Sequence, residues 1–203
     1  RKVRYRSADN IIKEIKYWIE KLKTNKFAFR DPVFSINRKY TVSLCEQIIS
    51  ENLKIEFQIE THLKNLDDEL IILLKRAGLK MIYVGIESSS PNVLKNIKRF
   101  TIDNDHQYQI IKKLKENGII VKSMFMLANP DDSVETIKDT IKYSKFLPNQ
   151  LVQFSVFTPY PGTPAYNEFK DKIIVRDFEK YNQYNLVYKH KLLNNDILIK
   201  LKN

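Results

Sequence analysis

The feature that most constrains the fold is an apolar run ending in polar residues, MIYVGIESSSP, at positions 81–91. Its first six residues are apolar apart from Gly85, which is typical of a strand buried on both faces in a parallel sheet. Gly85 permits close approach of a ligand or a neighbouring backbone. Glu87 and three serines follow where the strand should end, and Pro91 suits the first turn of a helix. Active sites of α/β folds lie past the carboxyl ends of such strands, so this stretch predicts either a site or a capped turn with a solvated glutamate.

Strand and helix patterns alternate along the whole chain. Five strands are predicted, over residues 26–30, 54–60, 80–85, 119–127 and 151–157. Each is followed by a helical segment, and a helix headed by Ser7 precedes the first strand. Regular alternation with short loops predicts an α/β fold with an all-parallel curved sheet and outer helices. Five strands are too few for a closed eight-stranded barrel, so we expect a partial barrel that lacks its first strand in this chain.

Helix boundaries are predicted from capping residues. Asn65 is expected to cap the third helix, with acidic residues in its first turn, and Gly78 to end it. After Pro91 a short helix is expected to about Ile97. A final helix is expected from Asn195. Residues 1–171 are predicted to form the barrel core, and residues 172–203 a C-terminal extension that packs on or near it.

Composition narrows the class of protein. The chain has 203 residues and a formal net charge of +11, but its lysines are scattered through helical segments, so nucleic acid is the less favoured partner. No apolar run approaches the roughly 20 residues of a membrane span. Cys45, the one cysteine, excludes an internal disulfide and falls at an apolar helical position, which fits a buried thiol and a reducing cytoplasm.

Polar residues collect where the predicted strands end. Since the carboxyl ends of parallel strands share one edge, these residues should form a polar mouth suited to a small molecule. They are Asp31, Glu60, Thr61, His62, Glu87, Ser88, Asn129, Asp131, Thr158 and Tyr160. Singly, each suits a cap or turn. No second ligand stands at metal spacing from His62, and no glycine-rich nucleotide motif occurs.

Five stretches together resemble one family, the radical S-adenosylmethionine enzymes, and within it the subgroup with an upstream cobalamin-binding domain. They are RYRSADNIIKEI (4–15), FAFRDPVF (27–34), AGLKMIYVGIESSSPNVLKNIKR (77–99), MFMLANPDDSVETIKDTI (124–141) and TPYPGTPAYNEF (158–169). Each motif alone is modest, but the five occur in the family's order and spacing over roughly residues 1–190.

The resemblance implies a partial (β/α)6 barrel in which the present strands are the second to the sixth. The family's first strand and its Cys-x3-Cys-x2-Cys loop are then expected before Arg1. That loop holds a [4Fe–4S] cluster, which cleaves S-adenosylmethionine to a 5′-deoxyadenosyl radical. Methyl transfer, carbon–carbon bond formation or rearrangement on a small molecule, lipid or cofactor precursor would fit. Cobalamin and an electron donor such as a flavodoxin or ferredoxin are implied as well.

The resemblance also implies roles for single residues. Asp31 is similar to the family position near the methionyl amino group. Glu87 and Ser88 resemble positions that contact the ribose and the methionyl end. Phe125 and Ala128 resemble the region that packs on the adenine.

Weaker substrate contacts are implied for Thr158, Tyr160 and Glu60. Glu60 stands where the subgroup often has arginine, which reverses the charge. The subgroup's Gly-Leu-Pro-Gly-Glu/Asp-Thr appears at residues 128–133 as Ala-Asn-Pro-Asp-Asp-Ser, without either glycine.

The missing cysteines are the largest departure from the family. Cys45 cannot replace them, so no metal ligands are assigned within this chain, and the chain alone is expected to be inactive. Two alternatives stay open. One is a tRNA methylthiotransferase-like enzyme, which would use the positive charge. The other is a cluster-less barrel that acts as a binding or scaffold module.

Overall fold

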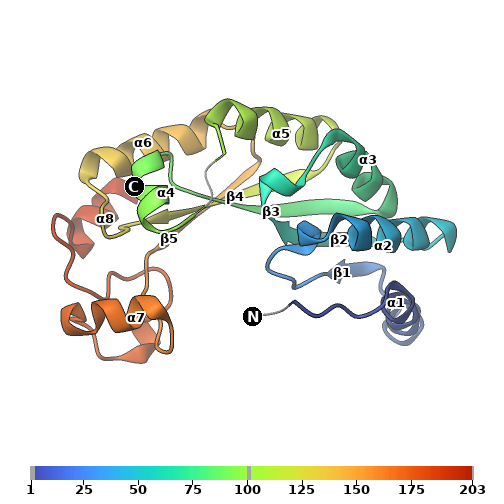
Figure 1. The fold of residues 1–203 in the computed structure, drawn as a ribbon, viewed down its shortest axis with the longest axis horizontal. Helices are drawn as coiled ribbons and strands as arrows, with labels where there is room; N and C mark the ends of the chain where they lie inside the picture. The colour runs from blue at the N-terminus through green and yellow to red at the C-terminus, as the bar shows by residue number, and fades with distance from the viewer. Residues whose placement is uncertain (1–2, 100–101, 203) are drawn as a thin grey trace. The chain divides into compact units, whose positions relative to one another are not determined.

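The computed structural model describes residues 3–99 and 102–202 of the chain (Figure 1). The strands are β1 (Lys26–Ala28), β2 (Glu56–Thr61), β3 (Leu79–Glu87), β4 (Ile120–Leu127) and β5 (Leu151–Val156). The helices are α1 (Ala8–Leu22), α2 (Arg38–Ser50), α3 (Asp68–Ala77), α4 (Pro91–Asn96), α5 (Asn104–Glu116), α6 (Val134–Phe146), α7 (Pro164–Phe169) and α8 (Asn195–Lys202). Each predicted strand and helix is present, with ends shifted by a few residues.

The five strands form one sheet in the order β1-β2-β3-β4-β5. β1 and β2 pair in parallel, with Phe27 opposite Phe57. β2 and β3 also pair in parallel, with Glu60 opposite Tyr83. A parallel sheet whose spatial order follows the chain order requires a helical crossover after each strand, as the alternating pattern predicts. The predicted α/β class with a parallel sheet and outer helices is confirmed.

One expectation about β3 is wrong. Its residues alternate, with Ile82, Val84 and Ile86 buried and Met81 and Tyr83 only half-buried. The strand is therefore fully buried on one face and mostly half-buried on the other. On the other face, the Tyr83 hydroxyl donates to Gln58 Oε1 at 3.1 Å.

The described residues divide into two compact units that interleave along the sequence. The first contains residues up to 85 with 105–122 and 148–151, and the second contains 86–104, 123–147 and residues from 152 on. The C-terminal segment beyond Asp171 belongs to the second unit. The boundary predicted after Asp171 stays a prediction.

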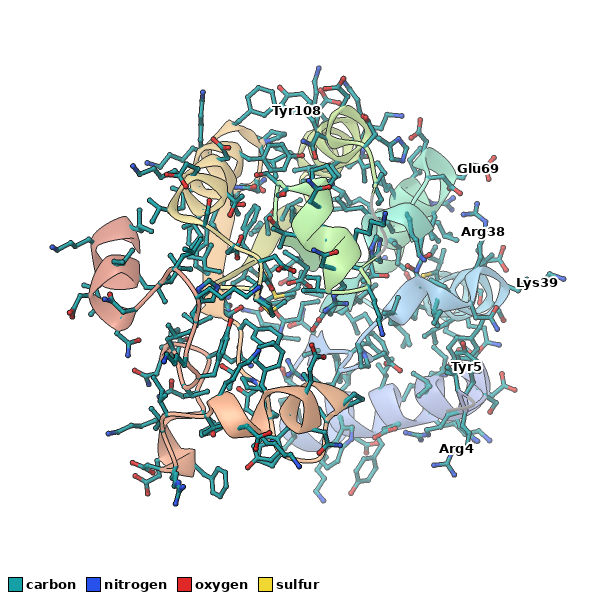
Figure 2. The ribbon with its side chains drawn as sticks, turned by 60° about the vertical axis from the view of Figure 1, so that its left-hand side comes forward. Arg4, Tyr5, Arg38, Lys39, Glu69 and Tyr108 are labelled. Atoms are coloured by element: carbon teal, nitrogen blue, oxygen red, sulfur yellow. The ribbon has the colours of Figure 1, made fainter. Side chains whose placement is uncertain are left out.

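In the first unit, α2 packs between α1 and α3. The buried side of α2 carries Leu44, Cys45 and Ile48, spaced as a helix face requires. Arg38, at the start of α2, reaches across to Glu69 at the start of α3 (Figure 2). This ion pair joins the ends of the two helices at the surface.

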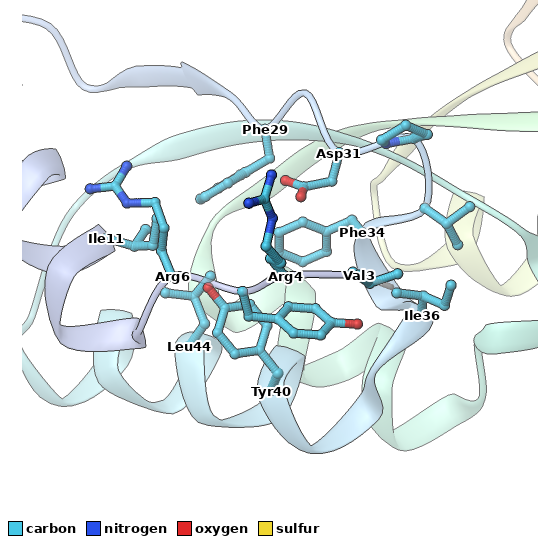
Figure 3. A pocket seen from close by; sticks show the side chains of 13 residues that line it. Val3, Arg4, Arg6, Ile11, Phe29, Asp31, Phe34, Ile36, Tyr40 and Leu44 are labelled. Carbon is cyan, nitrogen blue, oxygen red and sulfur yellow. The ribbon is translucent and has the colours of Figure 1, made fainter. Parts of the chain in front are cut away.

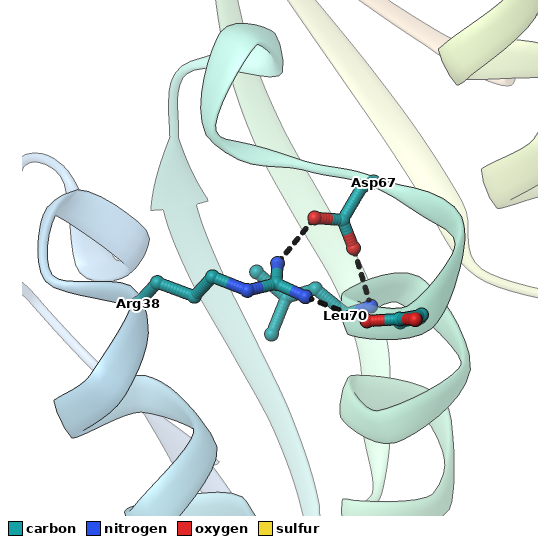
Figure 4. A network of polar contacts seen from close by, with 4 residues as sticks. Arg38, Asp67 and Leu70 are labelled. Atoms are coloured by element: carbon teal, nitrogen blue, oxygen red, sulfur yellow. Dashed lines mark hydrogen bonds and ion pairs between the residues drawn. The ribbon is translucent and has the colours of Figure 1, made fainter.

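The cap of α3 differs from the prediction. Asp67, and not Asn65, is its N-cap: Asp67 Oδ1 accepts a hydrogen bond from the Leu70 amide at 2.9 Å (Figure 4). Residues 63–65 form a separate 3₁₀ turn. Both Asn and Asp are good caps, and Asp67 is the one that directly precedes the first helical residue; Arg38 also binds its carboxylate. Gly78 ends the helix as predicted, with φ 111°.

The second unit has its own hydrophobic core, and the C-terminal segment contributes several of its buried side chains. Residues from β4, β5, α6 and α7 pack there with residues beyond position 171; the cluster comprises Leu127, Ala128, Ile137, Val156, Phe169, Leu186, Tyr188, Leu193 and Leu198. The Val156 amide donates to the Gln183 carbonyl at 2.7 Å. The C-terminal segment is thus an integral part of this unit.

Candidate functional site

A cavity of about 440 Å³ lies in the first unit, just beyond the carboxyl end of β1 (Figure 3). Its walls come from the chain before α1, the loop after β1 and the first half of α2, and comprise residues 3–6, Ile11, Phe29, residues 31–34, Ile36, Tyr40 and Leu44. Figure 3 shows the Asp31 carboxylate pointing into it. The cavity therefore lies where parallel sheets place their ligands.

Aromatic rings form much of the cavity wall. The Phe29 and Phe34 centroids are 5.0 Å apart, and so are those of Tyr5 and Tyr40. Burial raises the pKa of the Tyr40 hydroxyl, and the negative charge of Asp31 adds to the effect, so Tyr40 stays protonated.

The charged groups of the cavity suit a zwitterion. Asp31 supplies an anion, and Arg4 and Arg6 supply cations beside the rings. Arg6 also pairs with Glu14 of α1. A carboxylate and a guanidinium on an aromatic wall can take the ammonium and carboxylate of an amino-acid moiety.

The other predicted residues of the first unit stand at the end of β2. Glu60 is exposed, on the face of the sheet that also carries Gln58. Thr61 is buried and bonded to the Ser35 hydroxyl. His62 Nδ1 accepts from the Lys64 amide at 3.2 Å, which caps the following 3₁₀ turn. Thr61 and His62 therefore have local structural roles here.

Two of the predicted site residues lie in the second unit, at the carboxyl end of β3. Glu87 is the last residue of the strand, with φ 67°, and forms an ion pair of 2.9 Å with Arg99. Ser88 is buried; its Oγ lies 3.3 Å from Thr140 Oγ1 and accepts from the Ser90 amide at 3.1 Å. The Ser88 hydroxyl thus fastens the turn to α6. Glu87 keeps a partly exposed side chain.

The predicted adenine region follows β4. The Phe125 ring is fully buried and packs on Phe154 with centroids 5.5 Å apart. Ala128, directly after the strand, has φ 55°, a left-handed backbone that a glycine would adopt freely. The contacts to adenine predicted for Phe125 and Ala128 stay predictions.

A buried carboxylate holds the turn after Ala128. Asp132 Oδ2 accepts from the Asn129 amide at 2.8 Å and from Asn129 Nδ2 at 3.0 Å. Asp132 Oδ1 accepts from the Thr136 hydroxyl at 2.8 Å. Burial raises the pKa of Asp132, and these hydrogen bonds oppose the rise. Asn129 Oδ1 is buried without a hydrogen-bond partner among the described residues.

Two residues that sequence reasoning did not single out for the site also reach this turn. The Tyr188 hydroxyl donates to the Ala128 carbonyl at 2.8 Å. His190 Nε2 lies 2.9 Å from the Asn129 carbonyl oxygen. No local pattern announces these contacts, because the partners lie about sixty positions away in the sequence.

The predicted substrate residues after β5 make few contacts that bear on a site. Thr158 Oγ1 donates to the Val156 carbonyl at 3.0 Å. The Tyr160 ring is half-buried and lies 6.5 Å from that of Tyr181. Their roles, like that of Glu60, stay predictions.

The chain's own residues do not fit an iron–sulfur cluster. Cys45 is the one cysteine in the sequence, and it is buried in α2. Burial raises the pKa of its thiol to about 12, whereas cluster ligands are thiolates. Among the described residues, no group of three or more histidine, cysteine or acidic side chains could hold a metal ion. Nor is any described helix both long and apolar enough to span a bilayer.

Fold and cavity together define an α/β partial-barrel protein with a cavity beyond the carboxyl end of β1. Residues 1–144 match the family model of the radical SAM superfamily, and the chain belongs to that superfamily. The family predicted from the five motifs is confirmed.

Known relatives extend this similarity over most of the chain. It is 27% identical over 184 residues to the anaerobic magnesium-protoporphyrin IX monomethyl ester cyclase of Rubrivivax gelatinosus, which covers 90% of this chain and 33% of the cyclase. It is 26% identical over 198 residues to the bacteriochlorophyllide d C-12(1)-methyltransferase of Chlorobaculum tepidum, covering 97% of this chain and 43% of that enzyme. The chain therefore spans less than half the length of these relatives.

Among solved structures, the fold is similar to that of the radical S-adenosylmethionine methyltransferase TsrM from Kitasatospora setae. The TM-score is 0.74 at 17% identity, over 82% of this chain and 32% of TsrM. That structure contains cobalamin and a [4Fe–4S] cluster. The similarity supports the partial-barrel fold.

Proposed function

We propose that this chain is the larger part of the catalytic barrel of a cobalamin-associated radical S-adenosylmethionine enzyme that transfers a methyl group or closes a ring. The observation that carries the proposal is the cavity after β1, where Asp31 stands among aromatic walls in a chain of this superfamily. The names of the two sequence relatives, a cyclase and a methyltransferase, favour these reaction types.

Asp31 is proposed to bind the ammonium of the methionyl moiety, since its carboxylate points into the cavity. The positively charged guanidinium of Arg4 would bind the methionyl carboxylate. Tyr40, kept protonated by burial, would offer a neutral hydroxyl donor. The phenylalanine rings would exclude water from this end of the cofactor.

The cluster is proposed to be held by a Cys-x3-Cys-x2-Cys loop outside these 203 residues, because the chain's own thiol does not fit. When bound, cluster and S-adenosylmethionine supply the radical chemistry of the family. The proposed substrate is a small molecule, a lipid or a cofactor precursor, with tetrapyrroles the first class to test because both sequence relatives carry porphyrin or bacteriochlorophyllide names. A flavodoxin or ferredoxin is the proposed electron donor.

The decisive experiment uses the native protein with the segment that precedes this chain. Reconstitution under anaerobic conditions should yield iron and sulfide in cluster stoichiometry. A reduced sample should then consume S-adenosylmethionine, and Asp31→Asn should slow this consumption. A cluster-loaded protein that leaves S-adenosylmethionine intact with and without tetrapyrrole would contradict the proposal.

A second candidate is a cluster-less barrel that serves as a binding module. The loss of both glycines of the subgroup's motif at residues 128–133 and the acidic Glu60 favour it, because both depart from the subgroup's pattern. The same iron analysis separates the two functions. A native protein that takes up no iron, yet has a melting temperature raised by S-adenosylhomocysteine, would be the binding module.

A further inference from the structure

The turn after β4 is held by two side chains from the C-terminal segment. Tyr188 donates to the Ala128 carbonyl at 2.8 Å, and His190 Nε2 reaches the next carbonyl, that of Asn129, at 2.9 Å. Both side chains are buried. Two successive peptide groups of the turn therefore depend on residues far away in sequence for their hydrogen bonds.

The surroundings of His190 determine which ring nitrogen carries the hydrogen. Its Nδ1 accepts from the amides of Leu192 and Leu193 at 3.1 and 3.2 Å. Nδ1 therefore carries no hydrogen, and Nε2 carries it and donates to the Asn129 carbonyl. The Nδ1 atom of His190 thus stabilises the turn at residues 190–193, and its Nε2 atom binds the Ala128–Asn129 turn.

Tyr188 is equally well defined as a donor. Burial raises the pKa of its hydroxyl, with the negative charges of Asp132 and Asp131 adding to the effect, so it stays protonated. Its ring packs edge-on against Phe169 at 5.0 Å and against Phe157 at 5.7 Å. These contacts leave the hydroxyl little freedom to turn away from Ala128.

Ala128 needs this support because of its backbone. At φ 55° an alanine is less stable than in the ordinary regions, and such conformations persist where several surrounding contacts impose them. Asp132 holds the turn from within by two bonds to Asn129. Tyr188 and His190 hold the two carbonyls from outside. The turn is thereby restrained from both directions.

We propose that Tyr188 and His190 are positioning residues that keep the Ala128–Asn129 turn in the conformation that binds the adenosyl moiety. The inference rests on the proposed function and on the resemblance of the motif at residues 124–141 to the family, which implies that Phe125 and Ala128 pack on the adenine. It gives the C-terminal segment a functional role, because its two side chains fix the backbone of this turn.

The first test measures amide hydrogen exchange in the 203-residue chain, which requires no ligand. Tyr188→Phe removes one hydroxyl and should speed exchange at Asn129 and Asp132 by about tenfold, while Ile137 in α6 keeps its rate. Tyr181→Phe is the matched control, because Tyr181 also donates to a backbone carbonyl of the same segment, that of Val175 at 3.0 Å. It should leave the Asn129 and Asp132 rates unchanged. Equal rates in the two variants would overturn the inference.

A reciprocal pair of substitutions separates positioning from folding. In His190→Asn the side-chain oxygen can replace Nδ1 and keep the 190–193 turn, but no donor reaches Asn129. In His190→Gln the side-chain amide can replace Nε2 and keep that donor, while the 190–193 turn loses its acceptor. Positioning predicts that only His190→Asn speeds exchange at Asp132. A purely structural role of the 190–193 turn predicts the opposite order, which would refute the proposal.

The last test measures S-adenosylhomocysteine binding by calorimetry with the same proteins. Tyr188→Phe and His190→Asn should weaken binding by about tenfold, and Tyr181→Phe and His190→Gln by less than about threefold. If the wild type binds and all variants bind equally, the inference fails and the proposed function survives. If the wild type does not bind, the proposed function fails for this chain and the adenosyl role falls with it. The exchange data then still show what holds the turn.

Discussion

Glu87 and Ala128 share a left-handed backbone, with φ 67° and 55°, at the ends of two successive strands, β3 and β4. Neither is a glycine, although both conformations disfavour a side chain. Such conformations gather at functional sites, where the fold imposes them. The resemblance of the motifs to the family implies cofactor contacts for both residues, and these contacts stay predictions.

The backbone at Ala128 gives the first prediction. Ala128→Gly should leave stability within about 1 kcal/mol of the wild type, because relief of strain offsets the lost methyl burial and the added freedom of the unfolded chain. Ala128→Val should destabilise by at least about 2 kcal/mol, since a β-branched residue is disfavoured at positive φ and Ala128 is fully buried. Urea unfolding midpoints measure both. A valine variant as stable as the glycine variant would contradict the assigned conformation.

Asp67 gives the second prediction, because its two oxygens have separate tasks: one caps α3, and the other binds Arg38 (Figure 4). Asp67→Asn keeps the cap and loses the exposed ion pair, which should cost at most about 1 kcal/mol. Asp67→Ala loses both and should cost about 1 kcal/mol more. Chemical unfolding of the two variants separates the contribution of the helix cap from that of the ion pair. Equal losses in the two variants would show that the ion pair, and not the cap, stabilises this helix end.

Cys45 gives the third prediction. The thiol is fully buried, and burial raises its pKa to about 12, so it has almost no thiolate at neutral pH. Iodoacetamide should label it only as fast as the protein unfolds, and the unfolded protein in denaturant is the reference for full reactivity. Fast labelling of the native chain would show that α2 opens far more readily than its packing implies.

Asp132 gives a prediction about pH. Burial raises the pKa of Asp132 in the folded state, so the folded chain binds this proton more tightly than the unfolded chain does. The contribution of Asp132 to the stability of the fold is therefore most favourable at a pH below the pKa that its carboxyl has in the unfolded chain. It is lost as the pH rises through the pKa that the carboxyl has in the folded chain. The stability of the wild type relative to Asp132→Asn should therefore fall as the pH rises above about 3.9, the ordinary pKa of an aspartate. Unfolding curves across this range measure it, and a difference that grows with pH would have the wrong sign.

Asp31 gives a prediction about activity. Asp31→Asn removes the negative charge from the cavity and should weaken S-adenosylmethionine binding by about 10- to 100-fold in the reconstituted native protein, as the loss of a charged hydrogen bond does. Asp9→Asn is the matched control, since Asp9 is an exposed residue in the first turn of α1 and does not line the cavity. Equal affinities in the two variants would remove Asp31 from the site.

Much of the fold could be predicted because its signals are local. Ser7, Ser90 and Ser133 cap α1, α4 and α6 through hydrogen bonds to amides three residues on, which a sequence pattern reveals directly. The strand order follows from alternation and right-handed crossovers. Where two local signals compete, as between Asn65 and Asp67, the sequence pattern did not decide between them, because residues 63–65 form a separate 3₁₀ turn.

The candidate site was predictable only in part. The motifs placed Asp31 and Glu87 at strand ends, and the structure agrees. Ser88 was predicted at the same edge, but its hydroxyl turns inward to Thr140 of α6. The pattern of β3 indicated burial on both faces, whereas only one face is fully buried, because an apolar run cannot reveal what packs against each of its sides.

The amino-acid sequence by itself determined the order of strands and helices, the caps and the superfamily, since these depend on periodicity, on neighbouring residues and on motifs. The tertiary structure decided which side chains act together: the cavity around Asp31, the left-handed turn at Ala128, and the hold of Tyr188 and His190 on that turn. Such relationships join residues far apart in the chain. They exist only after the core has packed, because packing, and not local preference, brings these groups within hydrogen-bonding distance.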